Sequence, residues 1–539
     1  MSASCPQCGY NGQDHLPLSF EAADLSMSRM DELLKSNTPP LPAEHVQLES
    51  AIGKGHEFLA GLQERIVQAR ASLEDLLDEE RRVGRTVELY KIIERPILRV
   101  PEDVVREIFL TSLATEEEGT DTLSRQFVPL VLSQVCRDWR SIALSTSRLW
   151  SSIKLDFDLY HDEMACQYLL QMYLLRSATH DITLFIHSMR DISSCHLIPA
   201  ILLSAPRWTN LSVSIPYHSL HTFSAARGSL HRLNRLSIQF IGDVPDLPVG
   251  LAEPVFDAFE YAPLLRSFSL KGAYEGSKQI SLPWSQITEY AGDEGTTSFA
   301  DILKLAPRME SASLRLKKLW PHEVHNFPLI HEHTHKRLRI LHVYEFEDDF
   351  HSPVSPEACI THLLSHIAFP ALESLNMTYA HQWTRMPFFS PGSVPANLKS
   401  ISIDAIHIPQ YDIIELLDTT ASISSLSVAY SLTAAEDQNE GNPHYIHKDR
   451  LLLYLNANII PNAVPRLTSL AIRFLNEEPY LATSFVDMVQ SRRNATPTHA
   501  ALQTLRLSVP FVTPPHDPDV ATRWKDLCDE GFVTYGVEG

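Results

Sequence analysis

The sequence predicts an α/β protein in which a long N-terminal helix and a small helical unit precede an irregular solenoid. Three observations predict this fold class. Apolar residues repeat in steps of three and four over residues 46–95, two short amphipathic stretches lie within residues 96–152, and a leucine-containing phrase recurs through residues 153–539. These patterns are typical of a heptad helix, of half-buried helices and of stacked repeats.

Residues 1–45 are expected to be a flexible tail, because small and polar residues are followed by SNTPPLP, whose prolines stop a helix. The segment has neither the basic region nor the apolar run of a secretory signal. Cys5 and Cys8 in CPQCG would supply half of a tetrahedral zinc site, and only His15 lies near them. Two chains could share a metal there, but we expect a free tail and no metal site.

Residues 46–95 are expected to form one long, coiled-coil-like helix. Its seam consists of Leu48, Ile52, Gly55, Leu59, Leu62, Ile66, Ala69, Leu73, Leu76, Glu80, Val83, Val87 and Tyr90. The seam alternates steps of three and four, as a heptad repeat requires, and is weakest at Gly55 and Glu80. Its partner could be a second copy of the helix or the chain's own later domains, so self-association through residues 46–95 is one of two open alternatives.

Residues 96–152 are expected to form a small helical unit. Pro101 suits the first position of a helix, and Glu102 and Asp103 follow in the first turn, where the helix dipole favours acids. The apolar stripe of this helix comprises Val104, Val105, Ile108 and Phe109. A second helix is expected from about Phe127 to Leu144, with an apolar face of Leu132, Val135, Cys136, Trp139, Ile142 and Ala143. Two helices this short need a third helix or a partner to bury such faces.

Residues 153–539 are expected to form the solenoid. In the recurring phrase a small or apolar residue precedes a Leu or Met and a short alternating strand. The phrases span residues 231–240, 262–272, 306–316, 335–346, 369–379, 395–405, 464–474 and 499–509. Stacked helix–turn–strand units would place a parallel sheet on one face and helices on the other. An ordinary α/β domain is the alternative, but no glycine-rich nucleotide loop accompanies any strand.

The unit at residues 96–152 resembles the F-box. The resemblance rests on PILRVPEDVVREIF (96–109), VLSQVCRDWRSIA (131–143) and RLW (148–150). The chain departs from the family pattern at Val100, where leucine is usual, at Asp103, and in an acidic insertion near residues 114–126. With the heptad helix before it and degenerate leucine-rich-repeat-like phrases after it, the layout looks like the F-box proteins abundant in mushroom-forming fungi.

This resemblance implies a substrate-recognition adaptor of a Skp-cullin-F-box ubiquitin ligase. The F-box would dock a Skp-type linker subunit and, through it, a cullin, while the repeats recruit an unknown protein substrate. The residues that would meet the linker are Val100, Pro101, Val104, Ile108, Phe109, Leu132, Val135, Cys136 and Trp139. For Trp139 a place in the core is an equal alternative, and Trp150 is expected to pack against the start of the repeats.

Other functions receive less support from the sequence. The net charge of −21 argues against non-specific nucleic-acid binding, no apolar run is long enough to span a membrane, and scattered cysteines suit the cytoplasm or nucleus. HEHTH, with His331, His333 and His335, could bind a metal but is expected to be a solvated loop. Without a catalytic signature we expect no enzyme and no cofactor. A non-ligase scaffold that oligomerises through residues 46–95 is the main alternative; a hydrolase would reveal itself by a deep polar pocket.

Overall fold

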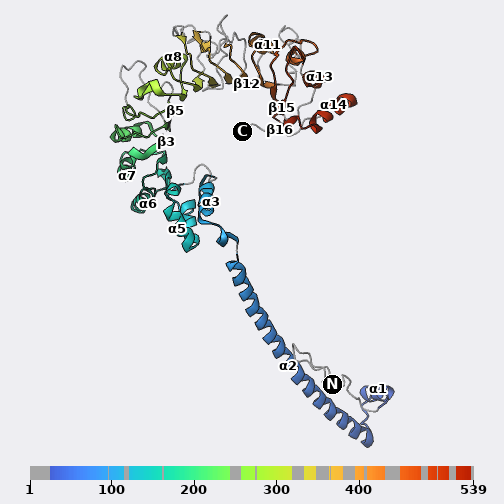
Figure 1. Cartoon of the computed structure of the whole chain (residues 1–539). Coiled ribbons are helices and arrows are strands. Elements are labelled where there is room, and N and C mark those ends of the chain that lie inside the picture. Colours follow the sequence, from blue (N-terminus) through green and yellow to red (C-terminus); the bar gives the residue numbers. More distant parts are fainter. Residues whose placement is uncertain are drawn as a thin grey trace. The chain divides into compact units, whose positions relative to one another are not determined.

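A computed structural model gives the structure of the chain. It describes residues 25–94, 96–114, 121–160, 163–242, 256–273, 276–317, 333–346, 363–364, 366–379, 395–405, 410–430, 450–474, 483–494, 496–508 and 517–535. The chain divides into two compact units, Met1–Val104 and Val105–Gly539. Figure 1 shows the elements of both units.

The first unit contains two helices, α1 (Met27–Lys35) and α2 (Pro42–Ile93). Helix α1 lies within the segment expected to be a flexible tail, so that expectation is wrong for these residues. The Ser26 hydroxyl caps α1 by accepting a hydrogen bond from the Arg29 amide at 3.3 Å. The Arg29 guanidinium in turn donates to Glu44 of α2 at 3.0 Å, which fixes one helix against the start of the other.

Helix α2 confirms the long helix predicted over residues 46–95. It runs for 52 residues with Pro42 in its first turn, and none of its side chains is buried. A 3-10 turn, η1 (Pro96–Arg99), follows it, and α3 (Glu102–Ala114) then begins directly after Pro101. Prolines therefore end one helix and open the next, as the sequence indicates.

The second predicted helix of the small unit is two helices, so the expectation of one helix over residues 127–144 is wrong. Helix α4 covers Val128–Val135 and α5 covers Arg137–Ser145. Between them Cys136 has extended backbone angles, φ −155° and ψ 177°, and its sulfur accepts a hydrogen bond from the Trp139 amide at 3.4 Å. Cys136 thus ends α4 and caps α5. A 3-10 turn, η2 (Ser147–Trp150), leads into the repeats.

One parallel sheet organises the repeats. Its strands are β1 (Ser152–Asp156), β2 (Ile182–His187), β3 (Trp208–Ile215), β4 (Arg235–Phe240), β5 (Ser267–Lys271), β6 (Glu289–Asp293), β7 (Ser311–Lys317), β9 (Ile340–Phe346), β11 (Ser374–Tyr379), β12 (Ser400–Ala405), β13 (Ser425–Tyr430), β14 (Ser469–Phe474), β15 (Thr504–Leu507) and β16 (Val533–Tyr535). Each strand pairs with the next of these along the chain, without a switch of direction or order. This order confirms the solenoid and excludes a doubly wound α/β domain, whose strand order reverses.

Helices connect the strands and lie on the outer side of the sheet (Figure 1). They are α6 (Glu163–Arg176), α7 (Ile198–Leu203), α8 (Thr296–Leu305), α11 (Gln410–Thr419), α12 (Arg450–Leu455), α13 (Thr483–Ser491) and α14 (Pro518–Asp529). A separate pair of two-residue strands, β8 (His333–Thr334) and β10 (Ile367–Ala368), lies outside the main sheet.

The recurring phrase places one apolar side chain ahead of each strand. In the eight phrases these side chains are at most 1% exposed: Leu233, Leu265, Met309, Leu338, Leu372, Leu398, Leu467 and Leu502. Backbone hydrogen bonds connect neighbouring phrases at the residue after this side chain. The Arg339 carbonyl, for example, accepts hydrogen bonds from the amides of both Glu373 and Ser374, at 2.8 and 2.9 Å. The phrase is therefore the unit that stacks.

A buried cation links the last repeats. The Arg492 side chain, just after α13, is fully buried, and its guanidinium donates to the backbone carbonyls of Leu455, Ala463 and Val464. Burial lowers the pKa of Arg492 to about 10. These bonds satisfy carbonyls of the long connection before β14, where Val464 has a positive φ of 41°.

Replacing this side chain should destabilise the repeats. Arg492→Leu would leave the buried carbonyls of Leu455 and Ala463 without this donor, whereas the Val464 carbonyl would still accept from the Leu467 amide. We therefore expect a loss of about 3 kcal/mol in unfolding free energy. Denaturant unfolding followed by circular dichroism measures it. The control Arg466→Leu, at an exposed position of the same connection, should change stability by less than about 0.5 kcal/mol. Equal effects of the two changes would contradict the role assigned to Arg492.

Candidate functional site

Exposed apolar side chains on the small helical unit form the candidate protein-binding surface. Ile108 of α3 is 41% exposed, and Val131 and Val135 of α4 are 45% and 58% exposed. Val104, at the first unit's end of α3, is 44% exposed. Val104 and Ile108 are four residues apart on one helix and therefore share a face. A helix face that stays apolar and exposed is suited to a partner's groove.

The predicted stripe of α3 splits into an outer and an inner half. Val105 and Phe109, one position further along than Val104 and Ile108, are 3% and 0% exposed. The Phe109 ring meets the Trp139 ring of α5 edge to face, with centroids 5.0 Å apart. The prediction that Phe109 contacts a linker is therefore wrong for this structure, because its side chain belongs to the core of the helical unit.

The other predicted contact residues fall into two groups. Those that are exposed are Pro101, Val104, Ile108 and Val135, and those that are partly buried are Val100, Leu132, Cys136 and Trp139. Trp139 packs on Phe109, which agrees with a place in the core, and it is only partly buried, so its contact with a linker stays a prediction. Val131 and Leu144, which are 45% and 40% exposed, were not predicted as contacts.

Hydrogen bonds fix the three helices in place. The Arg140 guanidinium of α5 donates to the Ser133 carbonyl of α4 at 2.8 Å. Arg106 of α3 donates to the Thr146 hydroxyl, directly after α5, at 3.3 Å. Since polar side chains satisfy the ends of the short helices, the exposed apolar side chains are presented from a defined frame.

Trp150 joins this unit to the repeats, which confirms the packing expected for it. Its side chain is fully buried, its indole N–H donates to the Ala143 carbonyl at 2.7 Å, and its ring lies 5.0 Å from the Tyr173 ring of α6. The guanidinium of Arg176, also on α6, lies 4.4 Å from the Trp150 ring centroid. Two tryptophans eleven residues apart therefore have different roles: one belongs to the helical unit and one anchors it.

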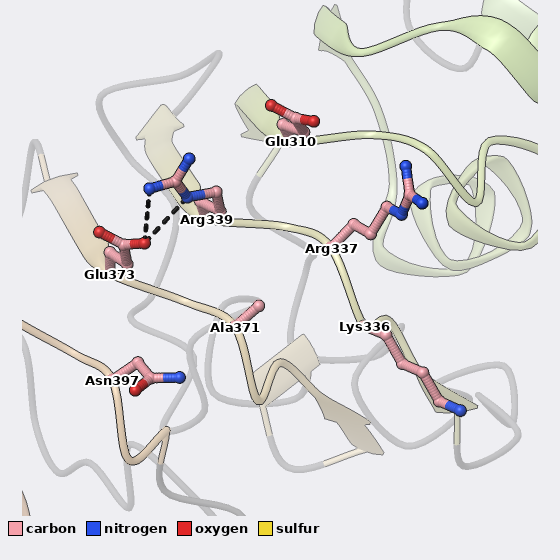
Figure 2. A pocket seen from close by; sticks show the side chains of 7 residues that line it. All are labelled: Glu310, Lys336, Arg337, Arg339, Ala371, Glu373 and Asn397. Carbon is pink, nitrogen blue, oxygen red and sulfur yellow. Dashed lines mark hydrogen bonds and ion pairs between the residues drawn. The ribbon is translucent and has the colours of Figure 1, made fainter.

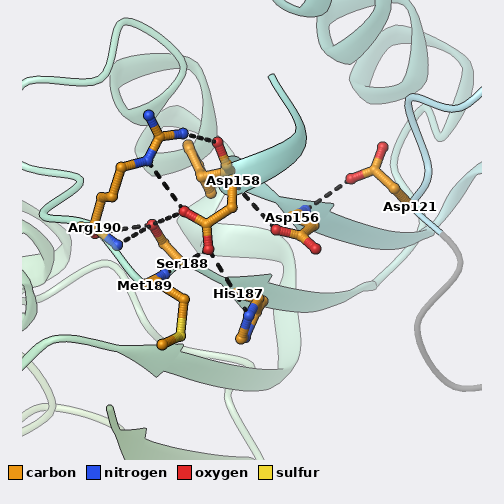
Figure 3. Close-up of polar contacts among 8 residues, drawn as sticks. Asp121, Asp156, Asp158, His187, Ser188, Met189 and Arg190 are labelled. Carbon is orange, nitrogen blue, oxygen red and sulfur yellow. Dashed lines mark hydrogen bonds and ion pairs between the residues drawn. The ribbon is translucent and has the colours of Figure 1, made fainter. Parts of the chain in front are cut away.

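A second connection runs from the segment before α4 to β1. The Asp121 carboxylate accepts hydrogen bonds from the amides of Leu123 and Asp156 and from the Tyr160 hydroxyl, all at 2.7 Å. Figure 3 shows Asp121 beside β1. The Thr122 amide donates to the Lys154 carbonyl of β1, and the Thr122 hydroxyl accepts from the Lys154 amide. Burial raises the pKa of Asp121, and the three hydrogen bonds oppose that rise.

The acidic cluster at the ends of β1 and β2 is an ion-pair network. Asp156, Asp158 and His187 each offer a ligand atom, and these atoms lie within 4.8 Å of one another. Arg190, however, already donates to Asp158 at 3.2 Å, as does the Met189 amide at 2.6 Å (Figure 3). Burial raises the pKa of Asp158, but these bonds outweigh it and leave the pKa below its usual range. Arg190 supplies the positive charge that a metal would provide.

The histidine-rich phrase has a structural role where it is described. His335 is 2% exposed, its Nδ1 accepts from the Leu338 amide at 3.1 Å, and its Nε2 lies 3.2 Å from the Ala306 carbonyl. The expectation of a solvated loop is therefore wrong for His335, and both of its nitrogens are already bonded. His333 lies in β8, whereas His331 and the Cys5–Cys8 pair lie outside the described residues.

A shallow surface pocket of about 300 Å³ lies where several strands begin (Figure 2). Its lining residues are Glu310, Lys336, Arg337, Arg339, Ala371, Glu373 and Asn397. Arg339 and Lys399 both pair with Glu373, at 2.7 and 3.1 Å, and their hydrogen bonds lower the pKa of Glu373. The lining is mainly charged, and the Arg339–Glu373 and Lys399–Glu373 pairs connect successive repeats.

The open face of the sheet offers a second surface. Along one hydrogen-bonded row, small hydroxyl side chains recur at Ser267, Ser311, Ser374, Ser400, Ser425, Ser469 and Thr504. Each is exposed or partly exposed. Small side chains here let another molecule approach the sheet closely.

Comparisons with known proteins identify no family for this chain. No protein-family model matches it, and no curated protein matches it. Among solved structures it is similar to the yeast Rad7 and Elc1 complex, with 14% identity, a TM-score of 0.29, and coverage of 85% of this chain and 97% of that chain. A likeness at that score does not establish a shared fold. Among the described helices, none combines the length and hydropathy needed to cross a membrane.

Replacing Asp121 should loosen the helical unit. In Asp121→Asn one acceptor becomes a donor while three hydrogen-bond donors still point at it, so we expect a loss of about 1–3 kcal/mol. Thermal unfolding and limited proteolysis of residues 105–150 measure the change. Asp181→Asn is the matched control, because Asp181 is 54% exposed and pairs only with Arg232 on the surface. Unchanged protease resistance in Asp121→Asn would contradict the assigned connection.

Proposed function

We propose that this protein is a non-enzymatic substrate adaptor of a Skp-cullin-type ubiquitin ligase. Helices α3 to α5 would dock the Skp-type linker subunit, and the repeats would recruit a protein target. The exposed apolar residues on α3 and α4, in a unit whose sequence resembles the F-box, carry this proposal. Scattered cysteines favour the cytoplasm or nucleus as its location.

The division of α3 into two faces supports a docking role. Val105 and Phe109 already supply the apolar contacts that the helical unit needs internally. Val104 and Ile108 are only partly covered within it, and each exposes apolar area to water. A partner that covers them gains roughly 25 cal/mol for each Å² of apolar surface removed from water.

The repeats support recruitment of a protein. Their sheet presents an extended face whose strand residues alternate between buried and accessible side chains, as in Ser267–Lys271 and in residues 469–473. Extended repeat surfaces of this kind bind macromolecules over many side chains.

A non-ligase scaffold is the second candidate, and one observation favours it. Helix α2 has 52 residues and none is buried, so it is available for assembly. A scaffold needs only α2 and the repeat face, and then the helical unit would simply cap the first strand. Binding to the linker separates the two functions, because only the adaptor requires it.

The adaptor function predicts which substitutions weaken linker binding. Ile108→Asp and Val135→Asp place a charge at exposed apolar positions, so each should leave the fold intact. Each should raise the Kd for a purified Skp-type linker about thirtyfold, equivalent to about 2 kcal/mol. Biolayer interferometry with the full-length chain gives these constants.

The control is Leu203→Asp, a similar change at an apolar residue that is 84% exposed on α7. It should leave linker binding unchanged. Thermal unfolding of each variant separates lost contact from lost structure. The adaptor role would be refuted if the wild-type chain failed to bind the linker, or if Ile108→Asp and Val135→Asp bound it as tightly as the wild type.

A further inference from the structure

The second half of the α2 seam stays exposed in the part of the chain that the structure describes. Along its seam, Ile66 is 50% exposed, Leu73 57% and Leu76 63%. The helix has no buried residue over its whole length. A single row of apolar side chains this long normally lies against another helix.

The composition of α2 also indicates that it needs packing. Gly53, Gly61 and Gly84 lie inside the helix, and a Cβ added at any of them would meet no atom within 4 Å. No close approach by a described residue therefore requires glycine at these three positions, yet each glycine weakens a helix relative to alanine. Helices in water gain most of their stability from packing of an apolar face.

We propose that α2 pairs with α2 of a second copy as an antiparallel two-stranded coiled coil. The partner is a second copy because the seam follows a strict heptad, and a heptad seam fits another helix with the same repeat. This inference does not depend on the ligase function.

Glu80 disfavours the parallel orientation. Parallel helices in register would place Glu80 of one copy against Glu80 of the other at a buried seam position. Desolvating two facing carboxylates is costly. The flanks disfavour it as well, because a parallel pair sets Arg65 of one helix beside Arg70 of the other.

An antiparallel pair resolves these conflicts in one register. The layers across the seam are Ile52 with Tyr90, Gly55 with Val87, Leu59 with Val83, Leu62 with Glu80, Ile66 with Leu76, and Ala69 with Leu73 of the second copy. Small residues then face larger ones, which keeps the layers evenly filled. Each Glu80 lies beside a leucine instead of another carboxylate.

The flanking charges select the same register. Arg65 of one helix lies beside Glu79 of the other, and Glu49 lies beside Lys91, and twofold symmetry makes each pair twice. Glu79 pairs with Arg82 of its own helix, but these side chains are 53% and 71% exposed, so Glu79 can accept a second cation. Arg70 of one helix lies beside Arg70 of the other at the twofold axis, and this repulsion between like charges is the unfavourable contact of this register. Sliding the helices by one heptad removes both attractive pairs.

The antiparallel pair has a consequence for the rest of the chain. The overlap spans residues 49–93, about 65 Å at 1.5 Å per residue. Because each chain continues from the C-terminal end of α2, the two copies would continue from opposite ends of the rod. Two target-binding surfaces would then act as a bivalent pair.

Sedimentation equilibrium of the full-length chain tests this proposal. The expected mass is twice the chain mass of 60.8 kDa. Arg65→Glu should raise the dissociation constant about tenfold, because it turns both Arg65–Glu79 pairs repulsive. Adding Glu79→Lys to Arg65→Glu should restore most of the affinity, and the double-mutant cycle isolates the pair from effects within one helix.

The matched control is Arg85→Glu, the same change at an outward position of α2, which should leave the dissociation constant within about twofold. In a parallel dimer Arg65→Glu would face Arg70 and tighten the dimer, which overturns the antiparallel orientation. A mass that stays at one chain, or exceeds two, overturns the pair itself. So would a double variant that is no tighter than Arg65→Glu alone.

Discussion

A parallel strand in a solenoid can bury its apolar side chains only against the repeats on either side, and this constraint governs the whole second unit. The buried row from Leu233 to Leu502 meets it, and the ladder at carbonyls such as Arg339 keeps each strand in register. The two ends of such a stack must be closed. At the last repeats Trp524 of α14 packs on Phe485 of α13, and at the first repeat the helical unit covers β1.

The helical unit therefore has an inner face that packs within the chain and an outer face that is exposed. Of its inner side chains, Phe109 packs on Trp139 within the unit, and Trp150 packs on Tyr173 of α6. Its outer side chains, Ile108 and Val135, keep much of their apolar surface exposed. Because Asp121 and Trp150 hold the unit against β1, a partner docked on its outer face would be held in a fixed relation to the start of the sheet.

The sequence predicted the repeats well because their period is set by packing. The predicted phrases do not include strands β3, β6 and β13. At the phrase's Leu or Met position these have Trp208, which begins β3, and Ile287 and Ile423, which precede β6 and β13; all three are fully buried. The break at Cys136 could not be predicted, because the apolar spacing continues through it while only the backbone changes. Likewise, a broad apolar stripe on α3 does not reveal whether Ile108 or Phe109 faces inward. That depends on Trp139, thirty residues later.

The side chains on the open face of the sheet differ along the strands, and these differences indicate which part of the face would give selectivity for a bound target. The hydrogen-bonded row at the start of the strands, here called the first row, is mostly serine from Ser267 to Ser469. The second row lies two residues further along each strand and is also largely small, with Ser237, Ser313 and Ser427. Longer side chains recur in the third row, at Lys271, Arg315, Tyr344 and Arg473. Small hydroxyls permit close approach but select weakly, whereas charged and aromatic side chains select by pairing and shape. Recognition would therefore concentrate where the strands end, on the side opposite the charged pocket at their beginnings.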